Sequence, residues 1–236
     1  YYRQAIQCRP HFPDALSDLV HCLTLVCSWT ERNRLLQQLL GMAKQQIAEG
    51  RMPSVQPHHS LIYPLAPTDV VTLTQAFARG IERMADQLPR PNYTLPLAKW
   101  RPGMGQRIRI GYMSSDFGDH PLSQLMQSVF ELHDRTRFEV FGYALTSHAG
   151  HPAWVKIKQG CEHFRDVSQK KTPEICEILR NEDQVHILVN LNGYTKGARN
   201  EVFIFRPAPV QVSYMGFPGT MGADWVDYLI TDYTVT

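Results

Sequence analysis

The sequence predicts an α/β protein in which an all-helical N-terminal region precedes a Rossmann-like lobe with a mostly parallel sheet. Two observations carry this prediction. Before residue 106 apolar residues recur at helical spacing, and after it short strand-like runs alternate with helical patterns. Strands that alternate with helices form right-handed βαβ units, and the parallel sheet that results is covered by helices on both faces.

Residues 1–29 predict a helix, a short turn and a second helix. Tyr2, Ala5 and Ile6 share one helical face before Pro10. The second helix has five apolar residues on one face: Ala15, Leu16, Leu19, Val20 and Leu23. The pattern resembles the end of a tetratricopeptide repeat, and since one such unit cannot bury its apolar face alone, we expect a longer solenoid upstream. An ordinary helical hairpin is the alternative.

Residues 30–105 are expected to form linking helices and a proline-rich connector. An amphipathic helix is predicted from Glu31 to Glu49, closed by Gly50. Its apolar face is formed by Leu35, Leu36, Leu39, Leu40, Ala43 and Ile47. Residues 51–67 contain four prolines and are expected to lack regular structure.

A further helix is predicted from Thr68, as the cap, to about Leu88. The residues expected to face inward are Val70, Val71, Leu73, Phe77, Ile81, Met84 and Leu88. Residues 89–105 are rich in proline and basic residues, and we expect the domain boundary there.

The lobe is expected over residues 106–236. Its predicted strands are IRIGYM (108–113), FEVFGYAL (138–145), HILVNL (186–191), VQVSYMG (210–216) and YLITD (228–232). Its predicted helices cover residues 121–133, 152–160 and 173–181. In such sheets ligands bind beyond the carboxyl ends of the strands, which here lead into the loops SSDFGDHP, NGYTKGARN and GFPGTMGA.

Composition limits the classes of function. The 24 basic and 22 acidic residues are spread along the chain, so the net charge of +2 provides no stripe for binding nucleic acid. The five cysteines lack CxxC spacing, which favours a reducing compartment over a disulfide framework or a zinc site. No apolar run approaches the roughly 20 residues of a membrane span, and the polar start is unlike a secretory signal, so a soluble protein is expected.

The turn SSDFGDHP places an acid and an imidazole between a strand and a helix. His120 precedes Pro121 and therefore lies beside the free N–H groups at a helix start, where a neutral imidazole is favoured. Asp116 could orient it. The alternative is structural: Asp116 caps backbone amides and His120 is an ordinary loop residue.

The other candidate features are weaker when taken alone. NGYTKGARN suits backbone approach to an anionic ligand but fits no dinucleotide or phosphate-loop template, and GFPGTMGA could admit a sugar or be a plain turn. His58 and His59 are neighbours on a segment expected to be extended, so they should point apart and form no two-histidine metal site. The chain contains no DxD triad, so no divalent metal is expected.

Three long runs together carry a family resemblance: MPSVQPHHSLIYPL, IGYMSSDFGDHPLSQLMQSVFELH and QVHILVNLNGYTKGARNEVFIFRPAPVQVSYMGFPGTMGADWVDYLITD. In this order they resemble the O-GlcNAc transferase family over nearly the whole chain. The resemblance implies a GT-B glycosyltransferase that moves N-acetylglucosamine from UDP-GlcNAc to Ser or Thr hydroxyls of intracellular proteins, with inversion and without a metal or other cofactor. It implies a cytoplasmic location, also nuclear in a eukaryote, and partners limited to UDP-GlcNAc and acceptor proteins or peptides, without nucleic acid or membrane.

The resemblance also implies roles for particular residues. His58, His120 and Asp116 match catalytic positions of the family. The positions that match its donor-binding segments are Pro121, Leu122, Lys196, Arg199, Met215 and Gly216. Sequence leaves the general base open among His58, His120 through a water, Asp116 through a water chain and the donor phosphate.

Departures from the family pattern bear on these expectations. Leu122 stands where Thr is common, Gln124 where His is common, and Asp119 where Asn is common. The chain stops inside the first lobe, whereas the family binds UDP mainly through a second lobe, so the isolated chain is expected to be inactive without that lobe and the upstream repeats. The alternatives are a relative with a different acceptor and a repeat-containing scaffold that has lost activity.

Overall fold

The computed structural model describes residues 1–101 and 105–234. Residues 102–104 of the expected connector and 235–236 of the expected lobe lie outside the described residues. The chain divides into two compact units, Tyr1–Arg83 and Met84–Thr236. The division falls inside a helix, before the proline-rich segment where the sequence placed the boundary.

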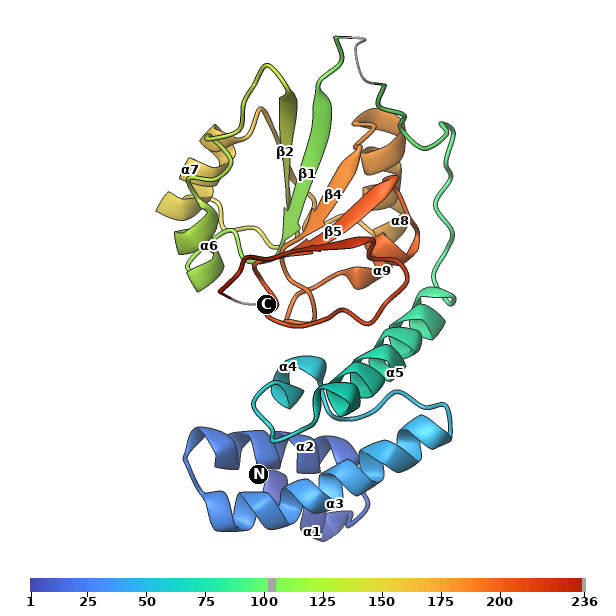
Figure 1. Ribbon diagram of the computed structural model, residues 1–236, viewed down its shortest axis with the longest axis vertical. Helices are drawn as coiled ribbons and strands as arrows, with labels where there is room; N and C mark the ends of the chain where they lie inside the picture. The colour runs from blue at the N-terminus through green and yellow to red at the C-terminus, as the bar shows by residue number, and fades with distance from the viewer. Residues whose placement is uncertain (102–104, 235–236) are drawn as a thin grey trace. The chain divides into compact units, whose positions relative to one another are not determined.

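The first unit is helical (Figure 1). Its elements are α1 (Tyr2–Cys8), α2 (Pro13–Leu25), α3 (Trp29–Ala48), α4 (Pro57–Ser60) and most of α5 (Pro67–Ala85). Its core contains the face predicted for α2, together with Leu36 and Leu39 of α3 and Leu73 of α5. The two predicted helices of residues 1–29 are therefore present, and burial of one apolar stripe on each of α2 and α3 holds them together.

Three expectations for the helical region are wrong. Residues 51–67 were expected to lack regular structure, yet they contain α4, because Pro57 occupies the first helical turn, where its missing N–H costs nothing. Thr68 was expected to cap α5, but the helix already begins at Pro67. On α5, Val71 and Met84 were expected inward and are exposed.

The imidazoles of His21 on α2 and His59 on α4 stack, with ring centroids 3.7 Å apart and an angle of 9° between the rings. Nδ1 of each ring is buried and has no hydrogen-bond partner among the described residues. Burial lowers the pKa of both imidazoles, and that of His59 falls to about 4. His58 acts in the same direction on both and His21 on His59, while Asp18 opposes the shift in both. The stack therefore depends on rings that stay neutral.

We expect the helical unit to lose stability as the pH falls from about 6.5 to about 4. In this window the unfolded chain binds protons on His21 and His59 that the folded state excludes, so protonation favours unfolding. The urea midpoint, followed by far-ultraviolet circular dichroism, measures the loss. His59→Phe keeps a planar ring and should flatten the pH dependence, whereas His11→Phe, at an exposed histidine, should leave it unchanged. Equal pH dependence in all three proteins would contradict the role of the stack.

The second unit is an α/β lobe with one parallel sheet. Its strands are β1 (Ile108–Ser114), β2 (Phe138–Ala144), β3 (His163–Asp166), β4 (Ile187–Asn190), β5 (Val210–Tyr214) and β6 (Tyr228–Ile230). Within the described residues they form a six-stranded sheet in the order β3-β2-β1-β4-β5-β6, and every neighbouring pair is parallel. The predicted Rossmann-like sheet is confirmed.

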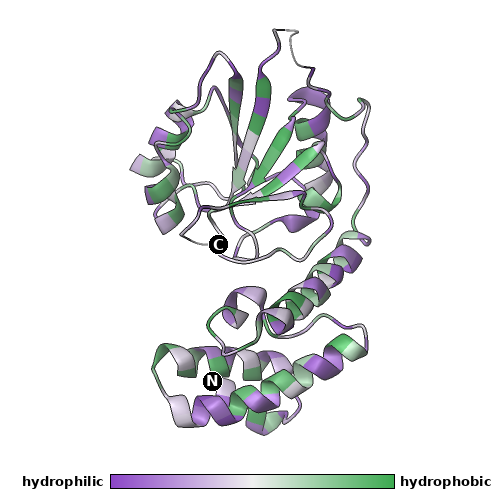
Figure 2. Ribbon diagram, in the orientation of Figure 1, coloured by the Kyte–Doolittle hydropathy of each residue, from purple (hydrophilic) through white to green (hydrophobic). Residues whose placement is uncertain are grey.

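Helices cover both faces of this sheet, as predicted (Figure 1). On one side lie α6 (Pro121–Met126) and α7 (Pro152–Gly160), and on the other lie α8 (Thr172–Glu177), the π-helix η1 (Ile178–Glu182) and α9 (Asn200–Ile204). Figure 2 shows hydrophobic residues concentrated on the central strands. Because β1 is buried on both faces, its sequence is a nearly continuous apolar run, and this run made it predictable.

The sequence missed or misjudged three elements of the lobe. The edge strand β3 has the sequence HFRD, in which Phe164 is the one apolar residue, so it gave no apolar run. The helix expected to reach His133 ends at Met126, after which Val129 and Leu132 donate to carbonyls three residues back, in turns tighter than an α-helix. The short α9 lies where no element was expected.

No helix within the described residues has both the length and the apolar character that crossing a membrane requires.

Candidate functional site

The carboxyl ends of β1 and β4 form the switch point of the sheet. From β1 the chain continues to β2 on one side, and β4 pairs with β1 on the other, so the loops that leave these two strands diverge. Met113 of β1 lies opposite Asn190 of β4, which places the two loops at one edge. In open parallel sheets such divergence leaves a crevice that binds ligands.

A cleft of about 350 Å³ lies at this point. It is lined by Ser115, Asp116, His120, Thr146, His148, Thr195, Lys196 and Gly197, which come from the loops after β1, β2 and β4. The structure thus brings together Asp116, His120 and Lys196, three of the residues singled out in the sequence.

The His120 imidazole caps α6. Its Nδ1 accepts the Leu122 N–H at 3.2 Å, and because a backbone N–H can only donate, Nδ1 carries no proton in this arrangement. A neutral His120 therefore has its proton on Nε2. The side chain is 49% exposed, and Nδ1 lies 4.0 Å from Oδ2 of Asp116. His120 thus offers one N–H donor to a ligand in the cleft.

The Asp116 carboxylate is held by side chains rather than by the backbone amides expected of a cap. Oδ1 accepts from the Ser115 hydroxyl at 2.7 Å, and Oδ2 accepts from the Asn192 amide at 2.8 Å. The backbone N–H of Asp116 donates to the Ser114 hydroxyl. The capping role that one alternative gave to Asp116 falls instead to His120.

Lys196 reaches the cleft on a loop that packs tightly against the one after β1. Its carbonyl oxygen lies 3.3 Å from the Ser115 hydroxyl oxygen. Gly197 follows with a φ of +85°, and a Cβ there would lie 2.7 Å from Ser115 Oγ. Glycine at this position therefore lets the two loops approach each other, while the Lys196 side chain stays exposed.

Other residues singled out in the sequence do not line this cleft. Both Pro121 and Leu122 belong to α6. The Leu122 side chain is buried in the hydrophobic core, and Pro121 is exposed at the first position of the helix. The Arg199 guanidinium is engaged by the Glu201 carboxylate, the Thr172 hydroxyl and the Lys170 carbonyl. Arg199 thus stabilises the loop after β4 from outside the cleft.

Met215 and Gly216 follow β5 and lie outside the cleft as well. Met215 is 41% exposed and has a φ of 60°, a left-handed conformation that is uncommon for a residue with a side chain. A Cβ at Gly216 would overlap the Leu191 carbonyl, so this glycine allows the segment after β5 to pack on the end of β4. The structure thus supplies a packing reason for Gly216.

His58 lies in the first unit, on α4, and is exposed. Its ring contacts that of His59 edge to face, with the centroids 6.4 Å apart, so the pair is neither on an extended segment nor parallel. Within the described residues, no three His, Cys, Asp or Glu side chains form a group that could hold a metal ion.

Sequence reasoning did not single out six residues at or behind the cleft: Ser115, Thr146, His148, Asn192, Thr195 and Gly197. Thr146 and His148 follow β2, and the rule that ligands bind at strand carboxyl ends would have included their loop. His148 donates from Nε2 to the Ser115 carbonyl at 3.2 Å. Asn192 is 1% exposed, and its role depends on contacts across the sheet that the sequence does not reveal.

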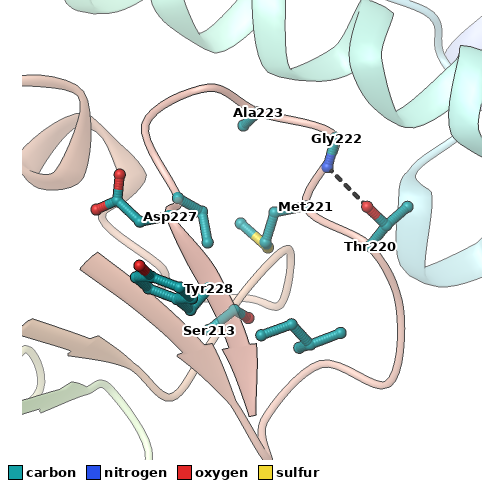
Figure 3. Close-up of a pocket in the computed structure, with 9 residues that line it drawn as sticks. Ser213, Thr220, Met221, Gly222, Ala223, Asp227 and Tyr228 are labelled. Atoms are coloured by element: carbon teal, nitrogen blue, oxygen red, sulfur yellow. Dashed lines mark hydrogen bonds between the residues drawn. The ribbon is translucent and has the colours of Figure 1, made fainter. Parts of the chain in front are cut away.

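A smaller hollow of about 190 Å³ lies under the GFPGTMGA loop between β5 and β6 (Figure 3). Figure 3 shows Met221, Ser213 and Tyr228 around it. The Ser213 hydroxyl is buried without a hydrogen-bond partner among the described residues. Asp227, on its rim, is paired with Arg206 and does not offer a free charge. The hollow is thus a small and mostly uncharged space.

The family model described as Glycosyl transferase family 41 matches residues 26–236. A protein of Arabidopsis thaliana, named Probable UDP-N-acetylglucosamine--peptide N-acetylglucosaminyltransferase SEC, is 46% identical over 220 residues, which are 92% of this chain and 22% of that protein. The UDP-N-acetylglucosamine--peptide N-acetylglucosaminyltransferase of Caenorhabditis elegans is 41% identical over 209 residues, which are 88% of this chain and 18% of that protein.

A solved structure of a mutant O-GlcNAc transferase from Thermobaculum terrenum is similar in three dimensions. It matches with a TM-score of 0.69 and 28% identity, over 98% of this chain and 42% of that one. The chain therefore spans about a fifth of the length of the curated relatives and less than half of this structure.

We expect Gly216→Ala to lower the free energy of unfolding of the lobe by about 3 kcal/mol or more, because the new methyl group would overlap backbone that cannot move aside easily. Urea unfolding measures the change. Gly41→Ala is the control: this helical position has open space around it, and the change should stabilise by about 1 kcal/mol. A Gly216→Ala protein as stable as wild type would show that the two segments do not pack as described.

Proposed function

The chain belongs to glycosyl transferase family 41, and from this premise we propose that it is part of an enzyme that transfers N-acetylglucosamine from UDP-N-acetylglucosamine to Ser or Thr hydroxyls of proteins, with inversion at the anomeric carbon. The names of the relatives support this donor and a peptide acceptor. We propose a cytoplasmic location on the same resemblance. Because the chain covers so little of those relatives, the complete activity requires further segments, among them the lobe expected to hold most of the UDP.

One observation carries the proposal: Asp116, His120 and Lys196 line a single cleft at the switch point of the sheet. This is the location where open parallel sheets bind ligands. In glycosyl transfer negative charge develops on the departing diphosphate, and an exposed ammonium such as that of Lys196 can stabilise it. His120 contributes an N–H that points in a fixed direction, and Asp116 contributes a carboxylate in a fixed position. The cleft therefore offers a hydrogen-bond donor and a hydrogen-bond acceptor to a ligand.

In the reaction, the acceptor oxygen forms a bond to the anomeric carbon as the bond from that carbon to the diphosphate breaks. The hydroxyl proton must leave to a base, and UDP departs with the electron pair. Nδ1 of His120 already accepts the Leu122 N–H, so the arrangement supports His120 as a donor from Nε2 to a sugar or phosphate oxygen. His58, Asp116 through a water, and the donor phosphate remain the candidate bases.

The test compares two histidines with the same structural role. His120 and His151 both precede a proline, and Nδ1 of each caps the helix that follows, at 3.2 and 3.3 Å. Of the two, His120 lines the cleft. In a protein that carries these residues with the remaining length of its relatives, we expect His120→Ala to lower transfer of labelled N-acetylglucosamine to a Ser-rich peptide at least about 100-fold. We expect His151→Ala to stay within about twofold of wild type, since loss of a helix cap costs only about 1 kcal/mol of stability.

Three outcomes would count against the proposal. Equal losses in the two variants would make His120 a helix cap and nothing more. Transfer of another sugar or to another acceptor would indicate the alternative of a relative with different specificity. Wild-type protein that transfers nothing would support the scaffold alternative.

A further inference from the structure

Asn192 lies behind the cleft, at the carboxyl end of β4, and contacts the loop after β1. It is 1% exposed, and all of its polar side-chain atoms are engaged by neighbours on the two loops. The side chain does not line the cleft itself, but it touches Asp116, which does. Its effect on any ligand must therefore pass through Asp116.

The orientation of the Asn192 amide is fixed by a partner that can only donate. The backbone N–H of Ser115 donates to Oδ1 at 2.8 Å, so Oδ1 must face this backbone N–H and the NH₂ group must point away from it. The NH₂ group then lies 2.8 Å from Oδ2 of Asp116 and 2.8 Å from Ser115 Oγ. A flipped amide would place two donors against the Ser115 N–H and an oxygen against a carboxylate.

Both oxygens of the Asp116 carboxylate therefore accept hydrogen bonds, one from each of two side chains that are hydrogen-bonded to each other. Asn192 donates to Oδ2, and Ser115, whose hydroxyl oxygen also accepts from Asn192, donates to Oδ1. Ser115 and Asp116 belong to the turn after β1 that also carries His120, whereas Asn192 belongs to the loop that carries Lys196. The contact consequently joins the two sides of the switch point.

A second set of hydrogen bonds fixes the backbone at Asn192 and at the residue that follows it. Its backbone N–H donates to Oδ1 of Asn190, which also accepts from the Gly193 N–H. The Asn190 amide donates to Oδ1 of Asn200, and the Asn200 amide donates to the Gly193 carbonyl. Asn190 and Asn200 are both buried. Because buried polar groups are costly to leave unpaired, this network fixes the loop in a single arrangement.

We propose that Asn192 is a positioning residue of the transferase, holding the Asp116 carboxylate at its distance from His120. The proposal rests on the proposed function for its catalytic consequence. Asn192 must donate and accept at once, and its substitutes lose one or both functions: Ala and Leu remove both the donor and the acceptor, and Asp keeps the acceptor but supplies a hydrogen only when protonated. With the carboxylate held, its negative charge stays at a fixed distance from the His120 ring, which donates from Nε2.

The first test is kinetic and uses the full-length protein. We expect Asn192→Ala to lower kcat about 100-fold with little change in the KM for UDP-N-acetylglucosamine, because a displaced Asp116 spoils geometry rather than donor binding. The matched control is Asn200→Ala, which truncates another buried asparagine of the same network that does not touch Asp116. Its kcat should fall much less. Equal losses of kcat in the two variants would overturn the proposal.

Asn192→Asp separates positioning from a general structural role. At low pH the new carboxyl at position 192 can supply the hydrogen that the amide provided, while at high pH two carboxylates face each other and Asp116 is pushed away. The kcat of Asn192→Asp, divided by the kcat of wild type at the same pH, should therefore fall as the pH is raised from about 5 to about 8. The titratable groups that share the cleft with Asp116, namely His120, His148 and Lys196, are the same in both proteins, so the ratio reports the effect of the substitution at position 192. A constant ratio would overturn the proposal.

A crystallographic comparison decides the positioning role without any activity. The separation between Asp116 Oδ2 and His120 Nδ1 should stay near 4.0 Å in wild type and in Asn200→Ala, and it should lengthen in Asn192→Ala. An unmoved carboxylate in Asn192→Ala would overturn the positioning role even if transfer were confirmed. If the wild-type protein had no transferase activity but Asn192→Ala still showed the longer separation, the proposed function would be overturned and the positioning of Asp116 by Asn192 would remain supported.

Discussion

The cleft depends on one constraint, the change of direction of the chain at β1 and β4. Parallel strands send all their carboxyl ends to the same edge, and the order β3-β2-β1-β4-β5-β6 makes the loops after β1 and β4 part from each other. Parted loops expose backbone polar groups, which need partners. The buried Asn192 side chain supplies one, since it accepts the Ser115 N–H from across the gap. The feature that opens the cleft thus also creates the demand that Asn192 meets.

Much of the fold could be predicted because burial on both faces leaves a strong signal. β1 and β2 are apolar along most of their length, and helical patterns lie between the central strands, so the sheet and its helical layers followed from the sequence. Elements that are short or lie at the edge of the sheet were missed. Three of the four residues of β3 are polar, so it gave no apolar run. α4 is a single turn in a proline-rich segment, where proline is usually taken to exclude helix although it suits a first turn.

The candidate site could be predicted in part, to the extent that it is local in sequence. Asp116 and His120 share one turn, and Lys196 belongs to the next loop along the edge, so the rule for strand ends was enough to name them. Asn192 was missed because its importance lies in the residue it faces, which is 76 positions away in the sequence. Leu122 shows the opposite error: next to the turn in sequence, its side chain is buried in the core and its backbone N–H is the part that reaches His120.

The two His-Pro pairs separate what a motif encodes from what its location adds. At His120 and at His151 the proline begins a helix, and Nδ1 of the histidine accepts an N–H of the first turn. In each case this leaves Nε2 to carry the proton of a neutral ring. Only the fold distinguishes them, because the first pair follows β1 at the switch point and the second follows β2. A helix cap fixes the tautomer and direction of an imidazole at little cost, and placing that cap at the switch point turns it into a directed donor beside a fixed carboxylate.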